Sequence, residues 1–564
     1  MKIGDLAFDE KNKVFINADK VISYSDGEKN ENYVFDTFKR AKDTSIFSME
    51  LFDRIKDWPS EYHFSTYRQN ILRPLNIKKN QTVLEIGAGC GAITRYLGEV
   101  GAQVTAVEGS LGRARCIAER CSDLKNVKVV CSNVEDVEFD QKFDIVTLIG
   151  VFEYTAKYSK REDPFHSALK SYIELLKPGG SLVIAIENKL GLKYFAGFNE
   201  DHFAAPYFGL ESRYGDKDIT TFGREEIQQM LLKVGFENTA FLYPFPDYKL
   251  PKVIISDNGL SEIEFNASDL VRFTKDRHYN PTPKANLLNE YLVWNTISEN
   301  KLLGDLSNSF LIVATNGKDQ ELITPSLLGQ YYTCNRYEPY NTATSFHRKD
   351  QEIQVRKEEL NVANENQTAL KELVHNTENE SSYINGNNLH HQITEALYKR
   401  RFKVYEELIG RWIEFLKEET LIQGEASESL IEPSFFDALP FNIIVDSSEK
   451  LNLFDQEWTA EKPFEIAFLV VRYLGMHKRN KGIYGKYASS YLGFVNKTLA
   501  TCGLEKISKR KLRLFEAEDE KVRNKINRNG GIAPLQIKKS LIFLCLNKLK
   551  EIKKYLLFGV FAQR

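Results

Sequence analysis

The stretch Val83-Leu84-Glu85-Ile86-Gly87-Ala88-Gly89-Cys90-Gly91-Ala92-Ile93-Thr94 decides how the rest of this chain is interpreted. Its apolar beginning predicts a buried strand, and the residues from Ala92 to about Gly98 predict a helix. The glycines between them permit positive φ angles and let a ligand approach the backbone closely. The helix offers unpaired N–H groups at its start. The pattern therefore predicts a ligand-binding unit of strand, turn and helix.

Two kinds of ligand are compatible with this turn. Dinucleotide-binding sheets use G-x-G-x-x-G/A, and because Ala92 stands at the third glycine position, the turn alone does not exclude a dinucleotide. Two acids favour another ligand. Glu85 precedes the first glycine, and Glu108 ends the next predicted strand, where a carboxylate would bind a ribose diol. This set resembles the S-adenosylmethionine (SAM) site of class I methyltransferases more than a nicotinamide site.

Bulk composition narrows the class of protein. The chain has 564 residues, which predicts two to four domains, and its net charge of -2 gives no general attraction to nucleic acid. Its seven cysteines are scattered without metal-binding spacing, as expected for reduced thiols in the cytosol. The first residues lack the apolar core of a signal peptide, and no run of 18 apolar residues exists. We therefore expect a cytoplasmic protein without a nucleic-acid partner.

Residues 81–245 alternate predicted strands and helices, which is typical of a parallel sheet with crossover helices. A ligand crevice is expected at the carboxyl ends of the first four strands. A helix is expected from Ser65 to about Leu72, and a tight turn at 177–180. The predicted strands are 82–87, 103–108, 127–131, 143–149 and 181–186.

The residues around the crevice suit the parts of SAM. Gly87, Gly89 and Gly91 would let the chain pass under the methionine part, and Glu85 would bind its ammonium group. The alternative for Glu85 is that it only stabilises the turn. Glu108 would bind the ribose through two charge-assisted hydrogen bonds.

The ends of the third and fourth strands would contact the remaining parts of the cofactor. Asn133 would bind the exocyclic amine of the adenine and Val134 the face of its ring, although Asn133 is also a common strand-end turn residue. Phe152 and Glu153 follow the fourth strand, where we expect the transferred methyl group.

The motifs just described resemble those of class I SAM-dependent methyltransferases, in segments 83–91, 143–154 and 176–180 and at Glu108. Segments 147–154, 185–197, 200–202 and 243–251 are similar to methyltransferases encoded in bacterial surface-polysaccharide clusters. The resemblance covers roughly residues 55–255. It implies a glycan or phosphosugar acceptor, and its family leaves the acceptor atom less well fixed than the fold.

The segment after the fifth strand contains the candidate catalytic residues Glu187, Asp201 and His202. His202 would act as a base toward a hydroxyl group, with Asp201 orienting it. The alternative is that 200–202 is a structural loop. In many class I methyltransferases the segment before the glycine strand folds over the cofactor, so Tyr62 or His63 would contact the ligand. The alternative there is a helix packed on the sheet edge.

A second set of residues lies beyond residue 330. Asn442 follows Asp437 by five positions, the spacing of a kinase catalytic loop, and Asp455 follows a predicted hairpin. Lys357, on a predicted strand, would bind phosphate. Residues 330–500 therefore resemble a divergent kinase or phosphotransferase fold. If active, Asp437 would accept a proton, and Asn442 and Asp455 would hold Mg²⁺ with ATP.

This second resemblance has departures. Phe435 and Phe436 stand where histidine and arginine are usual, Gln456 and Glu457 replace Phe-Gly, and no convincing glycine-rich loop is present. A degenerate scaffold or chance spacing is the alternative. Methyltransferase–kinase fusions that modify the growing end of a bacterial polysaccharide offer a precedent for the pairing.

The expected fold class is α/β: a Rossmann-like methyltransferase domain, then an α+β kinase-like domain and a C-terminal amphipathic helix. That helix, at 537–563, carries lysines that would bind the inner membrane face or a glycan-assembly partner, or it is simply packed. An active phosphotransferase and a non-catalytic assembly module are the alternative functions. The expected segments are 1–54 (lead-in), 55–255 (methyltransferase), 256–329 (connection), 330–504 (kinase-like) and 505–564 (charged tail).

Overall fold

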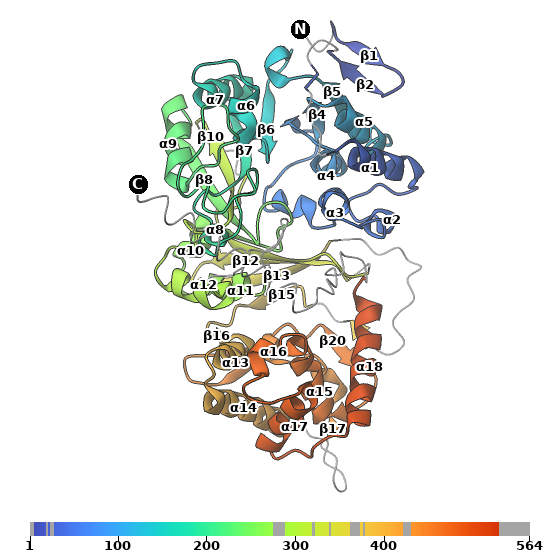
Figure 1. Cartoon of the computed structure of the whole chain (residues 1–564), viewed down its shortest axis with the longest axis vertical. Helices are drawn as coiled ribbons and strands as arrows, with labels where there is room; N and C mark the ends of the chain where they lie inside the picture. The colour runs from blue at the N-terminus through green and yellow to red at the C-terminus, as the bar shows by residue number, and fades with distance from the viewer. Residues whose placement is uncertain are drawn as a thin grey trace, which may run out of the picture.

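The computed structural model describes residues 5–17, 21–22, 27–274, 288–317, 322–337, 340–360, 373–375, 378–420 and 430–528. The helix predicted at 537–563 lies outside these residues. Figure 1 shows a sheet with flanking helices in the N-terminal half, and a mainly helical C-terminal part below it. Within the described part of the chain, no helix combines the length and apolar character needed to cross a bilayer.

The central feature is one sheet of 14 strands in the order β1-β2-β5-β4-β3-β6-β7-β10-β8-β9-β11-β12-β13-β15. From β2 to β7 neighbouring strands are parallel, and from β7 to β15 they are antiparallel. The strands are β1 (Ala7–Asp9), β2 (Val14–Ile16), β3 (Thr82–Ile86), β4 (Gln103–Glu108), β5 (Val127–Cys131), β6 (Phe143–Ile149), β7 (Leu176–Glu187), β8 (Asn238–Phe245), β9 (Val253–Ser256), β10 (Ser309–Thr315), β11 (Leu327–Thr333), β12 (Thr342–Lys349), β13 (Glu352–Glu359) and β15 (Glu380–Ser382).

Helices cover both faces of the parallel part, as expected for a Rossmann-like domain. Successive β3 residues belong to the apolar cores on opposite faces of the sheet. Val83 is in the core that contains apolar residues of α4 and α5, and Leu84 is in the core that contains those of α7 and α9. The helices of this half are α1 (Glu28–Arg40), α2 (Met49–Phe52), α3 (Trp58–Phe64), α4 (Ala92–Val100), α5 (Leu111–Arg120), α6 (Thr155–Tyr158), α7 (Pro164–Leu175), α8 (Leu192–Phe195), α9 (Arg224–Val234), α10 (Asp257–Ser261), α11 (Ala267–Arg272) and α12 (Glu290–Glu299).

The strands predicted at the glycine turn and its neighbours are confirmed, but two local predictions are wrong. The turn predicted at 177–180 lies inside β7, because a register shift against β6 and the positive φ of Gly179 absorb the extra residues. Ser65 does not begin a helix. The helix begins earlier, at Trp58, because Asp57 and Ser60 form a capping box there. Ser65 has an extended backbone and ends α3, and only a short 3₁₀ helix (Arg68–Ile71) follows.

The C-terminal part has its own core of buried apolar side chains around α13, α14, α15 and α17. The sheet runs across the expected boundary at 329/330, because β11 spans it and pairs with β9. The remaining elements are β14 (Leu373–His375), β16 (Asn387–Asn388), α13 (Leu389–Tyr398), α14 (Phe402–Thr420), β17 (Leu430–Ile431), β18 (Ile443–Val445), β19 (Leu451–Leu453), β20 (Trp458–Ala460), β21 (Phe464–Glu465), α15 (Ile466–Leu474), α16 (Lys481–Tyr484), α17 (Tyr491–Thr501) and α18 (Lys509–Ile526).

Candidate functional site

A cavity of about 660 Å³ opens at the carboxyl ends of the parallel strands. Each of five strands places a residue on its wall. They are Gly87 after β3, Glu108 at the end of β4, Asn133 after β5, Glu153 after β6 and Glu187 at the end of β7. This volume is typical of small-molecule sites, and the position is where ligands bind in open α/β sheets.

The glycine turn after β3 adopts a backbone that few other residues would accept. Gly87, Gly89 and Gly91 have φ angles of 68°, 59° and 82°. A Cβ on Gly87 would lie 2.5 Å from a methyl group of Val151, whereas a Cβ on Gly89 would meet no atom within 4 Å. Gly87 therefore packs against its neighbours, while Gly89 leaves open space above the turn.

Glu108 is held against this turn by the backbone. Its two carboxylate oxygens accept hydrogen bonds from the N–H groups of Gly89 (2.8 Å) and Ser110 (2.9 Å). Burial raises its pKa, and nearby Arg113 and the two N–H donors oppose that rise. The carboxylate is thus fixed on the cavity wall, with lone pairs left to accept from ligand hydroxyls.

Glu85 lies deeper than Glu108. It is buried within β3 and does not line the cavity, and its Oε2 has no hydrogen-bond partner. Burial raises its pKa to about 8. An unpaired buried carboxyl at the base of a ligand site is costly, and a nearby cation would stabilise its ionised form.

Other predicted cofactor residues divide between wall and core. Asn133 and Val134 line the cavity. Asn133 also acts as the turn residue considered above, since its Oδ1 accepts from the N–H of Glu135 at 3.1 Å. Phe152 does not line the cavity: its buried ring packs on Phe165 and Phe222, with centroids 5.4 and 6.0 Å apart. Its position fits a core residue, because the 3₁₀ turn after β6 directs the next residue, Glu153, to the cavity.

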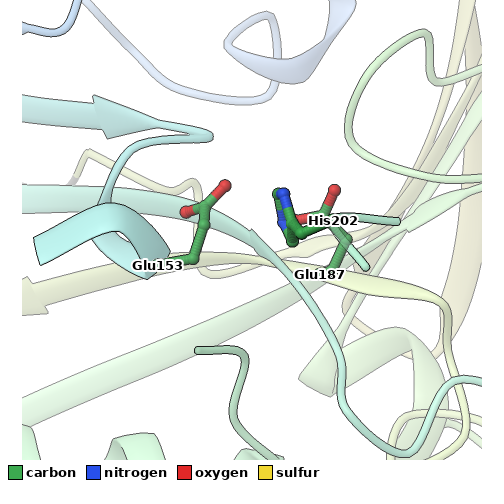
Figure 2. Close-up of side chains that lie close together, drawn as sticks. All are labelled: Glu153, Glu187 and His202. Carbon is green, nitrogen blue, oxygen red and sulfur yellow. The ribbon is translucent and has the colours of Figure 1, made fainter. Parts of the chain in front are cut away.

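Glu153, Glu187 and His202 form a cluster on the cavity wall, and Figure 2 shows their three side chains. One ligand atom from each lies within 4.8 Å of the others. His202 Nε2 is 3.8 Å from Glu187 Oε2, and its Nδ1 is 3.4 Å from the hydroxyl of Tyr154. Lys249 Nζ lies 2.5 Å from the other oxygen of Glu187.

Electrostatic interactions in this cluster shift the pKa values of the two glutamates in opposite directions. Burial would raise the pKa of Glu187, but Lys249 and His202 outweigh it and lower that pKa to about 2. Burial, together with repulsion from Glu187, raises the pKa of Glu153 to about 8. Burial lowers the pKa of His202, but Glu187 reverses the effect and raises it to about 9.

The expected orientation of His202 by Asp201 is not found. Asp201 also lines the cavity, but its carboxylate contacts Lys193 (2.6 Å), Tyr194 (2.7 Å) and Lys249 (3.2 Å). The two lysines attract the Asp201 carboxylate, and Glu187 is the acid that faces His202.

Two wall residues, Tyr248 and Lys249, are not predicted as site residues, because their segment, 243–251, carries only the family resemblance. Glu153 lies on the wall, just after the fourth predicted strand, where the transferred methyl group is expected. Tyr62 and His63, the candidates on α3, both line the cavity. The side-chain alternation of a strand predicts inward-facing residues, but loops such as 246–251 give no such signal.

The second predicted set of residues is also brought together. Lys357 on β13 pairs with Asp455 and with Glu457 (2.8 Å), and Asn442 donates to the backbone oxygens of Asp437 (3.0 Å) and Asp455 (3.3 Å).

The Asp437 carboxylate is already engaged. It accepts from the N–H of Trp458 (3.1 Å) and pairs with Arg472 (3.3 Å). Burial raises the pKa of Asp437 to about 6, although Arg472 opposes the rise.

Comparison with known proteins supports a methyltransferase domain in the N-terminal half of the chain. Residues 84–184 match the family model described as a methyltransferase domain. An uncharacterised methyltransferase of Staphylococcus carnosus is 29% identical over 148 residues, or 24% of this chain and 67% of that protein. A demethylmenaquinone methyltransferase of Tropheryma whipplei is 26% identical over 195 residues, or 31% of this chain and 74% of that protein.

Among solved structures, one similar chain is Haemonchus contortus phosphoethanolamine N-methyltransferase 2 in complex with SAM. The TM-score is 0.28 with 21% sequence identity, and the match covers 50% of this chain and 60% of that one.

Proposed function

We propose that this chain is a SAM-dependent methyltransferase that methylates a hydroxyl group of a sugar or phosphosugar in bacterial surface-glycan biosynthesis, because residues 84–184 match the family model of a methyltransferase domain. The observation that carries the proposal is the shape of the cavity. One end has the turn and Glu108, which suit SAM, and the other has the buried cluster of Glu153, Glu187 and His202.

The assignment of the two ends follows from the parts of the cofactor. Gly87 and the open space above Gly89 would accept the methionine part, Glu108 the ribose, and Asn133 with Val134 the adenine. When bound, SAM supplies an electrophilic methyl group on a sulfonium. The acceptor end would then lie beside Glu153 and Glu187, at the ends of the two following strands.

The wall of the cavity supports a sugar or phosphosugar acceptor. Tyr154, Tyr158 and Tyr248 offer aromatic faces and hydroxyl groups that suit a sugar. Methyl transfer depends mainly on holding the acceptor oxygen in line at close distance. A hydroxyl acceptor must also lose a proton, and the cluster of Glu153, Glu187 and His202 would promote that loss.

Two measurements test this function. Calorimetry should detect SAM binding by the wild-type chain and its loss in Glu108→Ala. Mass spectrometry of cell-surface glycans should then show a methyl group that disappears on gene deletion and returns with the wild-type gene but not with Glu108→Ala. Absence of SAM binding would end the proposal, and unchanged glycan methylation would remove the glycan acceptor.

A second candidate function is phosphoryl transfer by the C-terminal part. It is favoured by contacts that join three segments: Lys357 on β13, the loop of Asp437 and Asn442, and Asp455 after the hairpin of β18 and β19. Lys357 would bind phosphate, and Asn442 and Asp455 would hold Mg²⁺ with ATP.

ATP turnover with Mg²⁺ tests this second candidate. Turnover should vanish in Asp455→Ala and persist in Glu108→Ala, which leaves the C-terminal part intact. If the wild-type chain neither binds nor turns over ATP, the C-terminal part is a scaffold without this activity.

A further inference from the structure

We propose that Glu153, Glu187 and His202 form a binding site for a divalent cation, which positions and activates the acceptor hydroxyl. This inference rests on the proposed methyltransferase function, since it concerns the acceptor end of the same cavity. Figure 2 shows the Glu153 carboxylate beside the overlapping side chains of Glu187 and His202.

The strongest observation is the set of unused polar atoms. Both carboxylate oxygens of Glu153, Oε2 of Glu187 and Nε2 of His202 are buried without a hydrogen-bond partner. Glu153 and Glu187 are fully buried, and the His202 side chain is 10% exposed. Buried polar groups normally have partners, so several unused atoms facing one another on a cavity wall indicate a missing ligand.

The geometry suits one ion. Ligand atoms on opposite sides of an ion lie about 4.4 Å apart, at roughly 2.2 Å each from the metal. The 4.8 Å spread of the three ligand atoms therefore needs only a small side-chain adjustment. Two carboxylates with one imidazole are a common kind of donor set for divalent metals such as Mn²⁺.

The surroundings of each ligand support this role. The Nδ1 atom of His202 faces the hydroxyl of Tyr154, and donation to that oxygen would leave Nε2 with its lone pair toward the carboxylates. Lys249 pairs with Oε1 of Glu187, and Oε2 of Glu187 has no hydrogen-bond partner.

The cation would bind the acceptor oxygen and make its proton easier to lose. In the reaction the hydroxyl proton passes to water, and the oxygen lone pair forms the bond to the methyl carbon. The S–C bond breaks with its electron pair remaining on sulfur, so the products are the methyl ether and S-adenosylhomocysteine. His202 then acts as a ligand and positions the cation instead of serving as the base.

Mn²⁺ binding to the full chain tests the site directly. After treatment with a chelator, the protein is titrated with Mn²⁺, and free Mn²⁺ is followed by electron paramagnetic resonance. We expect one Mn²⁺ per chain at this site, with binding weakened at least about tenfold in Glu153→Gln and in His202→Gln, because losing even an outer partner of a metal ligand costs 10–100-fold.

Two control variants locate the bound ion. Glu225→Gln, on the exposed side of α9, should bind Mn²⁺ as the wild type does. Asp455→Asn should also bind Mn²⁺ at Glu153, Glu187 and His202. If the C-terminal part binds a second Mn²⁺, this variant should lose only that second ion. If the wild type binds no Mn²⁺, or if Glu153→Gln and His202→Gln both bind it normally, the inference is wrong.

SAM binding, measured on the same samples, separates this inference from the proposed function. Glu153→Gln should still bind SAM, which also shows that the variant is folded. SAM binding without Mn²⁺ binding would reject the cation site alone, whereas absence of SAM binding would reject the proposed function.

Discussion

The backbone N–H of Gly89 donates a 2.8 Å hydrogen bond to Oε2 of Glu108. This contact joins the glycine turn after β3 to the acidic end of β4, so two segments 19 residues apart form one wall of the cavity. The same carboxylate that anchors the turn also faces the ligand space.

Replacing Glu108 by glutamine should weaken SAM binding about 10- to 100-fold. The amide keeps the size of the side chain but loses charge-assisted hydrogen bonds, which contribute about 1.5–3 kcal/mol each. Titration calorimetry measures the change. Asp140→Asn, at an exposed acid before β6, should leave the affinity unchanged, and equal affinities for Glu108→Gln and the wild type would contradict the ribose role.

Alanine at Gly89 and at Gly87 should have different consequences. Gly89→Ala forces a positive φ on alanine, at a cost of about 1–2 kcal/mol, and places a methyl group in the space expected for the cofactor. Gly87→Ala adds a clash with Val151, which should cost about 1–3 kcal/mol more. Thermal unfolding should therefore rank Gly87→Ala as the less stable variant, and calorimetry should show weak SAM binding by Gly89→Ala.

The double variant Gly87→Ala/Val151→Ala is the matched control for the clash. It should recover part of the stability lost in Gly87→Ala. If both single variants unfold at the same temperature, packing against Val151 is not what requires glycine at position 87.

Glu85→Gln should stabilise the ligand-free protein, and increasingly so between about pH 5 and pH 8. Burial raises the pKa of Glu85 to about 8 from its ordinary value of 4.5. Between these values the unfolded chain releases the proton while the folded chain retains it, so this group costs more folding stability as the pH rises. Above pH 8 the difference should level off. Unfolding midpoints of wild type and variant, measured across this range, provide the test, and a constant difference would contradict the raised pKa.

Lys249→Met should destabilise the protein by about 3–5 kcal/mol, because it leaves Glu187 and Asp201 buried without one of their cation partners. Lys189→Met removes a lysine of the same chemistry whose partner, Glu226, is half exposed, and should cost at most about 1 kcal/mol. Denaturant unfolding of both variants compares the two. Similar losses would show that burial of the acidic cluster does not govern its stability.

Local pattern was sufficient to place the parallel strands and the ligand crevice. The apolar runs that became β3 to β6 are bounded by glycine or polar residues, and residues at the end of each strand or just after it lie on the cavity wall. Pattern failed where a local signal competed with pairing. Pro178 and the two glycines after it predict a turn, but pairing with β6 extends the strand through them.

Partnerships between side chains were harder to foresee. Asp201 and His202 are neighbours in sequence, and this adjacency suggested that one orients the other. In the fold, Asp201 forms ion pairs with lysines from two other segments, and Glu187 at the end of β7 faces His202. Sequence distance carries no information on which charged groups share a buried pocket.

By itself, the sequence determined the α/β alternation, the glycine turn and the acid that ends the second parallel strand, because these depend on backbone freedom and on side-chain periodicity along a single segment. Only the tertiary structure decided that Glu153, Glu187 and His202 converge, that Phe152 belongs to the core, and that Lys357 meets Asp455. Those contacts join residues that are distant in the chain, and they arise from how the sheet twists and how the loops cross its edge.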